Sequence, residues 1–167
     1  MREVESVAGP AGLTPAPTPY GVTRHVGDVT LQALWPPPDA PTTGPGDGSA
    51  ANEASVVLLA EVHGIRILLT GDIEPEGQAR LAQALPDLRV DVLKIPHHGS
   101  RYQDEPWLLS LRARVALVSV GSDNDYGHPA EAALEPLEAA GTRVLRTDQD
   151  GDLAVVADDG DLATVTR

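Results

Sequence analysis

Residues 55–70 constrain the fold of this chain more than any other segment. Two runs rich in Val, Leu and Ile, at 55–62 and 65–70, are separated only by His63-Gly64. A two-residue connection ending in Gly between such runs is typical of a β-hairpin, because Gly accepts the positive φ that a tight turn needs. The segment therefore predicts an antiparallel strand pair near the middle of the chain.

After the hairpin, the pattern changes to alternating helices and strands. Helical spacing of apolar residues, with Pro or Gly near the ends, predicts helices over Glu74–Leu85, Glu105–Ala113 and Pro129–Ala140. Apolar runs predict strands over Val90–Ile95, Val115–Val120, Thr142–Arg146, Asp152–Ala157 and Leu162–Val165. A hairpin followed by such units predicts an α/β fold in which helices cover one face of a mixed sheet.

The segment before the hairpin is less regular. Four prolines among the first 20 residues predict a flexible lead-in over residues 1–25, followed by one partial domain over residues 26–167. A short strand over Val29–Leu34 is expected before three consecutive prolines. From there a mobile loop rich in Pro and Gly is expected to reach about Ala51.

Composition limits the classes of function. A length of 167 residues suffices for one domain with its own core, and the absence of Cys excludes disulfides and thiolate zinc sites. The net charge of −13 repels phosphate backbones, so a basic nucleic-acid-binding surface on the chain itself is not expected. No apolar run approaches the roughly 20 residues that a membrane span requires, and the chain is expected to be soluble.

The chemically informative residues each follow one of three predicted strands. They are Asp72, the pair His97-His98, and the loop residues Asn124, Tyr126 and His128. In α/β sheets, functional groups collect at the carboxyl ends of strands. We therefore expect these side chains to converge at one rim of the sheet.

Asp72 and the histidine pair are candidate metal ligands. A carboxylate that directly follows an apolar strand and a Gly is costly to enclose without a cation, although capping of the next helix is an alternative role for Asp72. One imidazole of His97-His98 can bind metal while the other donates to substrate, or both are residues of a solvated loop. The sequence leaves open which histidine is the ligand.

Three further residues have substrate-side interpretations. The ring of His128, beside the first amides of the helix predicted from Pro129, would favour an anion such as phosphate, and the alternative is helix capping. Ser100 either bonds a phosphate oxygen or caps the next turn. Lys94, the only lysine in the sequence, lies in the same segment as the histidine pair.

Taken together, these motifs resemble the C-terminal part of the metallo-β-lactamase-fold hydrolase domain of ComEC-type competence proteins, the channels that carry transforming DNA across bacterial membranes. The resemblance runs from about Val26 to Ala157 and rests on five ordered segments: Asn52 with Ser55–Leu58, Leu68–Glu74, Leu93–Ser100, Val118–Pro129 and Arg146–Gly151. It implies half of an αββα sandwich, belonging to a parent protein in the cell membrane with this domain on the extracytoplasmic side.

The resemblance also implies phosphodiester hydrolysis, with degradation of one DNA strand during uptake, assisted by two zinc or manganese ions in the complete domain. Carried onto this sequence, the resemblance implies that Asp72 and either His97 or His98 are metal ligands. The catalytic or substrate-side groups that it implies are His98, His128, Asn124 and Tyr126. The substrate-binding groups that it implies are Ser100, Asn52 and Lys94.

Members of that family also carry an HxHxDH segment, which does not occur in this sequence. We therefore expect a C-terminal fragment that binds metal weakly or not at all, and that is inactive or feeble alone. Its expected partners are the N-terminal half of the domain, single-stranded DNA and the membrane channel domain. The alternative is a non-catalytic binding or assembly module that uses an unpaired sheet face and self-associates.

Overall fold

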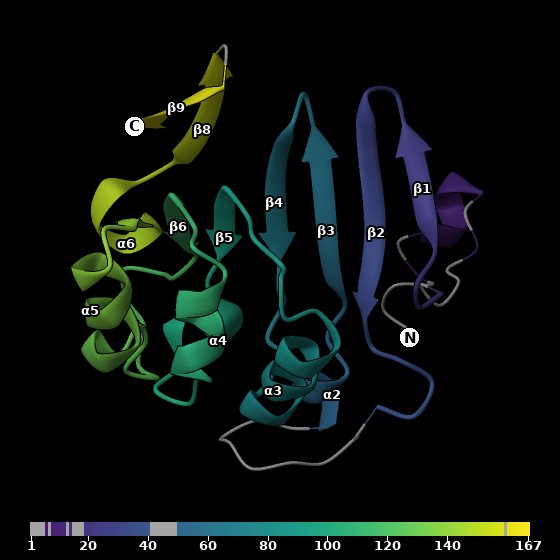
Figure 1. Ribbon diagram of the computed structural model, residues 1–167, viewed down its shortest axis with the longest axis horizontal. Helices are drawn as coiled ribbons and strands as arrows, with labels where there is room; N and C mark the ends of the chain where they lie inside the picture. The colour runs from purple at the N-terminus through teal and green to yellow at the C-terminus, as the bar shows by residue number, and fades with distance from the viewer. Residues whose placement is uncertain (1–5, 7, 13, 15–18, 41–49, 159) are drawn as a thin grey trace.

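The computed structural model describes residues 6, 8–12, 14, 19–40, 50–158 and 160–167. A seven-stranded sheet has the order β1-β2-β3-β4-β5-β6-β7, and β8 and β9 form a separate ribbon (Figure 1). The strands are β1 (Thr23–Val26), β2 (Val29–Trp35), β3 (Val57–Val62), β4 (Ile65–Leu69), β5 (Val92–Lys94), β6 (Val115–Val118), β7 (Arg143–Arg146), β8 (Leu153–Asp158) and β9 (Asp161–Thr166). The helices are η1 (Gly9–Ala11), α2 (Ala50–Glu53), α3 (Pro75–Ala84), η2 (Pro96–Gly99), α4 (Glu105–Ser110), α5 (Glu131–Ala139) and α6 (Thr147–Asp150).

The predicted hairpin is confirmed. β3 and β4 pair antiparallel with Val62 opposite Ile65, so that His63 and Gly64 alone form the turn. Their φ angles of 49° and 78° are both positive, as a two-residue turn that follows the right-handed twist of the strands requires.

The predicted mixed sheet is also confirmed. β4 to β7 pair in parallel, and α3, α4 and α5 lie in the three connections between them. Parallel neighbours joined by helical crossovers all end at the same edge. The carboxyl ends of β4, β5 and β6 therefore share one rim, on the lower side of the sheet in Figure 1.

The helices cover one face of the sheet. Leu68 of β4 and Leu93 of β5 are fully buried, and they share a core with Leu81 of α3, Trp107 of α4 and Leu137 of α5. Side chains alternate between the two faces of a strand, so the neighbouring positions point away from this core.

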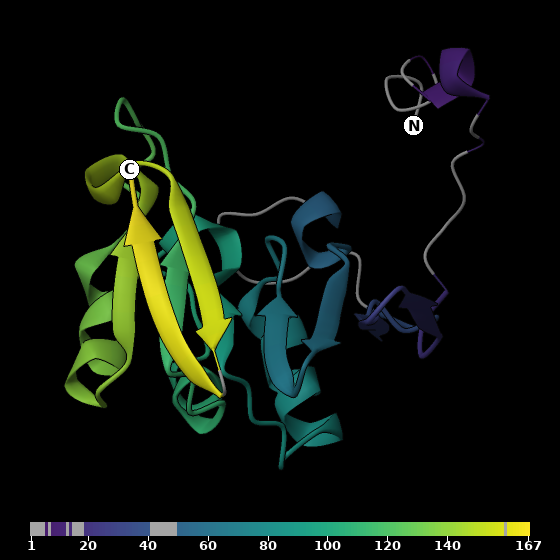
Figure 2. The ribbon, with the colours of Figure 1, turned by 90° about the horizontal axis from the view of Figure 1, so that it is seen from above.

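The opposite face is only partly covered. The β8–β9 ribbon, which Figure 2 shows along its length, lies across Ile65, Ile67, Val92 and Leu117. A cavity of about 810 Å³ separates the ribbon from these side chains. Leu69, at the end of β4, is 40% exposed. This second face is therefore apolar and incompletely packed.

Besides the short helices η1, η2 and α6, the elements β1 and α2 were not expected from the sequence. β1 pairs antiparallel with β2 at the edge of the sheet, so the predicted lead-in boundary at residue 25 falls inside a strand. All four β1 residues are exposed and show no apolar alternation, and only the pairing with β2 makes them a strand. The other residues of the predicted lead-in are described only in part, and residues 41–49 of the predicted mobile loop lie outside the described residues.

Several predicted elements end earlier than the apolar pattern suggested. β6 stops at Val118 because the backbone N–H of Val120 donates to Thr147 Oγ1 instead of continuing the strand ladder.

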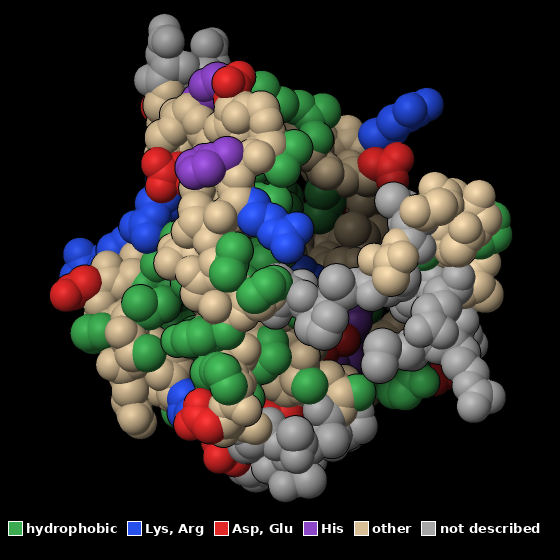
Figure 3. Space-filling view, turned by 90° about the vertical axis from the view of Figure 1, so that its right-hand side faces the viewer, with side chains coloured by type: hydrophobic (Ala, Val, Ile, Leu, Met, Phe, Trp, Pro, Cys, Tyr) green, Lys and Arg blue, Asp and Glu red, His purple; other side chains and the backbone are tan. Residues whose placement is uncertain are grey.

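No helix within the described ranges has both the length and the apolar character to span a bilayer. On the side of the molecule that faces the viewer in Figure 3, basic side chains are scattered among acidic and apolar ones.

Candidate functional site

The three predicted rim segments meet at the carboxyl ends of β4, β5 and β6. Asp72 Oδ1 lies 3.6 Å from His98 Nε2. The rings of His97 and His128 pack edge to face, with their centroids 5.3 Å apart. The predicted convergence of these residues is thus confirmed, although they come from three separate connections.

The histidine loop has an unusual backbone. His97, His98 and Gly99 adopt three successive left-handed conformations, with φ of 45°, 53° and 79°. For a residue other than Gly this costs about 1–2 kcal/mol, and such strain clusters at functional sites. Contacts from outside hold the loop, since the His97 N–H donates to Gly71 O and the Ala130 N–H donates to Gly99 O.

His98 and Asp72 are oriented as metal ligands commonly are. His98 Nδ1 lies 2.6 Å from Ser119 O, and because a carbonyl only accepts, Nδ1 carries a proton and Nε2 is the ring nitrogen that faces Asp72. A metal-ligating imidazole usually donates its other N–H in this way. The two side chains are 42% and 36% exposed, so a cation can reach both.

These two side chains fit one side of a cation. Their 3.6 Å separation is one that a single ion with bonds of about 2.0–2.2 Å can span. A structural zinc site takes about four ligands. Within the part of the chain that the structure describes, no group of three or more His, Cys, Asp or Glu side chains is placed to hold one ion. Asp72 and His98 would therefore supply only two of the ligands that such an ion needs.

A buried polar cluster lies beside the histidine loop. The buried carboxylate of Glu74 lies 3.2 Å from His97 Nδ1 and accepts a hydrogen bond from Asn52 Nδ2 at 3.2 Å. Sequence reasoning placed Asn52 near the site but missed Glu74, because an acidic residue at the start of a predicted helix has an ordinary local explanation. The available signal was its place in the motif Gly-Asp-Ile-Glu, two residues after the candidate ligand Asp72.

The side-chain amides of Gln103 and Gln78, which the sequence did not single out, connect the histidine loop to the helices. Gln103 Nε2 donates to Pro96 O at 3.1 Å and to Ser100 O at 3.0 Å. Gln78, which is fully buried, donates to Gln103 Oε1 at 3.0 Å. These contacts connect α3 and the start of α4 to the loop.

Lys94 and Ser100 are used mainly within the protein. Lys94 Nζ donates to Gly71 O and Ile95 O and lies 3.8 Å from Asp72 Oδ1. Burial lowers the pKa of Lys94, and the charge of Asp72 opposes this shift. Ser100 is fully buried and its Oγ accepts the N–H of Tyr102, which corresponds to the turn-capping alternative.

The loop after β6 presents two rings near the site. Asn124 Nδ2 donates to His128 O, while Asn124 Oδ1 accepts the N–H of Tyr126, so this side chain shapes the loop. Tyr126 is exposed and stacks with His128. Helix α5 begins at Glu131 with Ala130 as its N-cap residue, so His128 does not cap it.

Three bacterial proteins are similar to most of this sequence. ComE operon protein 3 of Bacillus subtilis is 38% identical over 132 residues, which are 78% of this chain. The similarity is to one segment of this relative. Competence protein ComA of Neisseria gonorrhoeae is 35% identical over 61% of the chain, and recombination protein 2 of Haemophilus influenzae is 34% identical over 64%.

The chain spans only 16%, 15% and 13% of the length of these three relatives, respectively. No protein-family model matches the sequence. Among solved structures, a Parabacteroides distasonis protein described as a metal-dependent hydrolase is 17% identical, with a TM-score of 0.48. The match covers 77% of this chain and 56% of the Parabacteroides chain.

A second carboxyl group is buried next to the polar cluster. Glu53 of α2 lies against Gly77 at the start of α3, where a Cβ atom would come within 2.6 Å of Glu53 Oε1. Burial raises the pKa of Glu53 to about 7; the backbone N–H of Glu74 opposes the rise, and the charges of Glu76 and Glu74 add to it.

Glu53 is expected to make stability depend on pH. Because its folded-state pKa lies above the unfolded value of 4.5, the protonated group stabilises the native state below about pH 4.5, and this contribution is lost as the pH rises through 7. Glu53→Gln should remove this pH-dependent decrease in the free energy of unfolding, which amounts to up to about 3 kcal/mol. Urea unfolding of the wild type and the variant at acidic and alkaline pH measures the decrease. Glu61→Gln, at an exposed β3 position, is the control, and equal pH dependence of Glu53→Gln and the wild type would contradict the assignment.

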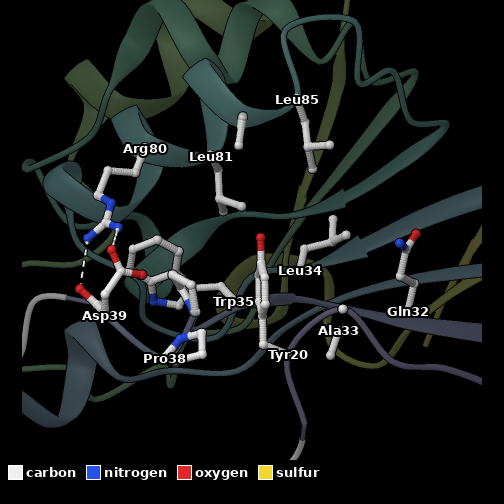
Figure 4. Close-up of a pocket in the computed structure, with 13 residues that line it drawn as sticks. Tyr20, Gln32, Ala33, Leu34, Trp35, Pro38, Asp39, Arg80, Leu81 and Leu85 are labelled. Atoms are coloured by element: carbon white, nitrogen blue, oxygen red, sulfur yellow. Dashed lines mark hydrogen bonds and ion pairs between the residues drawn. The ribbon is translucent and has the colours of Figure 1, made fainter.

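A separate cavity of about 400 Å³ between β2 and α3 contains none of the predicted site residues (Figure 4). Tyr20 points across it toward α3, and Arg80 forms an ion pair with Asp39 while lying 5.5 Å from the centroid of the Trp35 ring. Trp35 Nε1 donates to Glu53 O at 2.7 Å. The end of β2 is thereby tied to the polar cluster.

Proposed function

We propose that this chain is the C-terminal portion of a metal-dependent phosphodiesterase domain in a DNA-uptake competence protein, with single-stranded DNA as its substrate. The observation that carries the proposal is the approach of Asp72 Oδ1 to His98 Nε2, in a strained loop at the rim of the sheet. Similarity to competence proteins supports the setting. The mixed sheet with helices on one face is compatible with half of a metallo-β-lactamase sandwich.

Asp72 and His98 would hold the divalent cation, zinc or manganese, at this rim. When bound, such an ion acts as a Lewis acid toward a phosphoryl oxygen. Positive charge at the rim would also make an otherwise acidic chain, with a net charge of −13, locally attractive to phosphate.

The loop after β6 would supply the substrate-side groups. His128 and the exposed ring of Tyr126 would contact the DNA, and Asn124 would keep this loop in shape through its bonds to both. Lys94 would keep the ends of β4 and β5 together beside Asp72, through its contacts with two backbone carbonyls.

The remaining metal ligands would come from an N-terminal half of the same domain, the part that carries HxHxDH in the family. Its proposed binding surface is the second face of the sheet, where Leu69 is exposed and Leu58 and Ile67 are partly exposed. Burial of apolar surface at this face would favour association. The channel domain in the membrane would belong to the same parent protein.

Complementation tests this proposal. The chain mixed with a polypeptide that supplies the HxHxDH half is expected to cleave single-stranded DNA and bis-p-nitrophenyl phosphate in the presence of zinc or manganese, at least about a hundredfold faster than either part alone. His98→Ala should abolish the gain, whereas His25→Ala, at the exposed sheet edge, should preserve it. Metal-independent cleavage, or full activity of His98→Ala, would overturn the proposal.

A non-catalytic docking module is the second candidate. The incomplete packing of the second face, with a cavity of about 810 Å³ beneath the ribbon and Leu69 exposed beside it, favours it, because exposed apolar surface marks an interaction site. In this case the isolated chain should self-associate. Light scattering that gives a monomeric mass at every concentration would exclude self-association, and a Leu69→Asp variant should reduce the mass if this face is used.

A further inference from the structure

One side-chain amide bonds both ends of the strained histidine loop. Gln103 Nε2 donates to Pro96 O at 3.1 Å and to Ser100 O at 3.0 Å. The three left-handed residues, 97–99, lie between these two carbonyls. An amide NH₂ group has two hydrogens, so one is used at each end of the loop. Because a strained backbone persists only where its surroundings hold it, Gln103 is one of the groups that keep the loop in this form.

A second amide connects Gln103 to the loop that carries Asp72. Gln78 is fully buried, and its Nε2 donates to Gln103 Oε1 at 3.0 Å and to Ile73 O at 2.8 Å. Ile73 directly follows Asp72 in the chain. The backbone beside the aspartate is therefore joined to the backbone on both sides of the histidines through two side chains.

Backbone groups at the two ends of this network fix the orientation of both amides. The N–H of Asp104 donates to Gln78 Oε1 at 2.7 Å, so the other amide atom of Gln78 is the nitrogen, which faces Ile73 O and Gln103 Oε1. At the other end, the two loop carbonyls only accept, so the nitrogen of Gln103 faces them. Every N–H of the two amides thus has an acceptor, and a fully satisfied polar network makes a structure rigid.

We propose that Gln78 and Gln103 are positioning residues that hold the loops of Asp72 and His98 at the separation at which both side chains bind one cation. Asp72 Oδ1 and His98 Nε2 lie 3.6 Å apart. If the histidine loop were released, φ at His97 and His98 could return to negative values, and the His98 ring would move away from Asp72. The proposal rests on the proposed function for the use of the cation, whereas the fixed loop geometry does not depend on it.

Backbone ¹³C shifts of the whole chain, recorded without metal or DNA, test the proposal because they distinguish positive from negative φ. The wild type is expected to show positive φ at His97 and His98. Gln103→Met keeps the length of the side chain but has no N–H, so the signals of residues 97–99 should shift toward negative φ or broaden through exchange between conformations. Gln83→Met, at an exposed position of α3, should leave these signals unchanged. Unchanged shifts at both histidines in folded Gln103→Met would overturn the proposal.

Titration with zinc alone separates positioning from a general contribution to stability. Folded Gln103→Met should bind zinc at least about tenfold more weakly than the wild type, as is found when residues behind metal ligands are replaced. A role in stability alone predicts a lower free energy of unfolding with an unchanged zinc affinity, and that result would contradict the proposal. A wild type that binds no zinc counts against the proposed function, and the backbone shifts then decide the role of the two glutamines.

The side-chain hydrogens of Gln103 in the wild type give a second measurement, which decides if Gln103→Met does not fold. Both hydrogens are bonded to loop carbonyls, so their exchange with water should be slower than that of the exposed Gln83 amide. Exchange as fast as that of Gln83 would show that Gln103 does not hold the loop and would overturn the proposal.

Discussion

Replacement of Asp72 by asparagine is expected to lower the rate of phosphodiester hydrolysis by the complemented domain at least about a hundredfold. Mutation of residues that only hydrogen-bond to metal ligands already lowers metal affinity or activity by about 10- to 100-fold. Asparagine keeps the shape and one oxygen of the side chain but loses the negative charge that faces His98 Nε2 at 3.6 Å. The loss should therefore appear in metal affinity as well as in kcat.

The control for Asp72→Asn is Asp87→Asn, which makes the same acid-to-amide change at an exposed position beyond α3. Steady-state kinetics at saturating zinc or manganese, together with metal titration, separate a weakened site from an inactive one. Circular dichroism verifies that both variants are folded. Near wild-type activity of folded Asp72→Asn would remove Asp72 from the site.

Replacement of Gly99 by alanine is expected to reduce the free energy of unfolding by about 3 kcal/mol, from the left-handed backbone and from overpacking together. Gly99 has a φ of 79°, and a Cβ atom there would lie 2.5 Å from Pro129 Cβ and 3.2 Å from Pro129 Cα. Neither atom belongs to a flexible side chain, so the histidine loop and the loop after β6 would have to move apart.

Gly127→Ala separates the two contributions to this loss. Gly127 also has a positive φ, of 71°, but a Cβ atom there would meet nothing within 4 Å, so about 1–2 kcal/mol is expected. Urea unfolding followed by circular dichroism gives both values. Equal losses for Gly99→Ala and Gly127→Ala would show that the approach to Pro129 contributes nothing to stability.

Much of the fold could be predicted because its signals are local. The turn at His63-Gly64, the helical spacing after Asp72 and the short apolar strands are each encoded within a few residues, and all are present. The rim could also be predicted, since the parallel order of strands brings their carboxyl ends together. What remained open was the use of each side chain at that rim.

The sequence by itself determined the mixed sheet, its central hairpin and the meeting of Asp72 with the two histidine-bearing loops, because periodicity and turn chemistry act over short distances. Only the tertiary structure decided that His98 faces Asp72, that His97 is enclosed by Glu74 and Asn52, and that Glu53 is buried. These outcomes depend on packing between α2, α3 and the histidine loop, segments that lie far apart along the chain. Burial and orientation are sums over such contacts, and no single segment contains them.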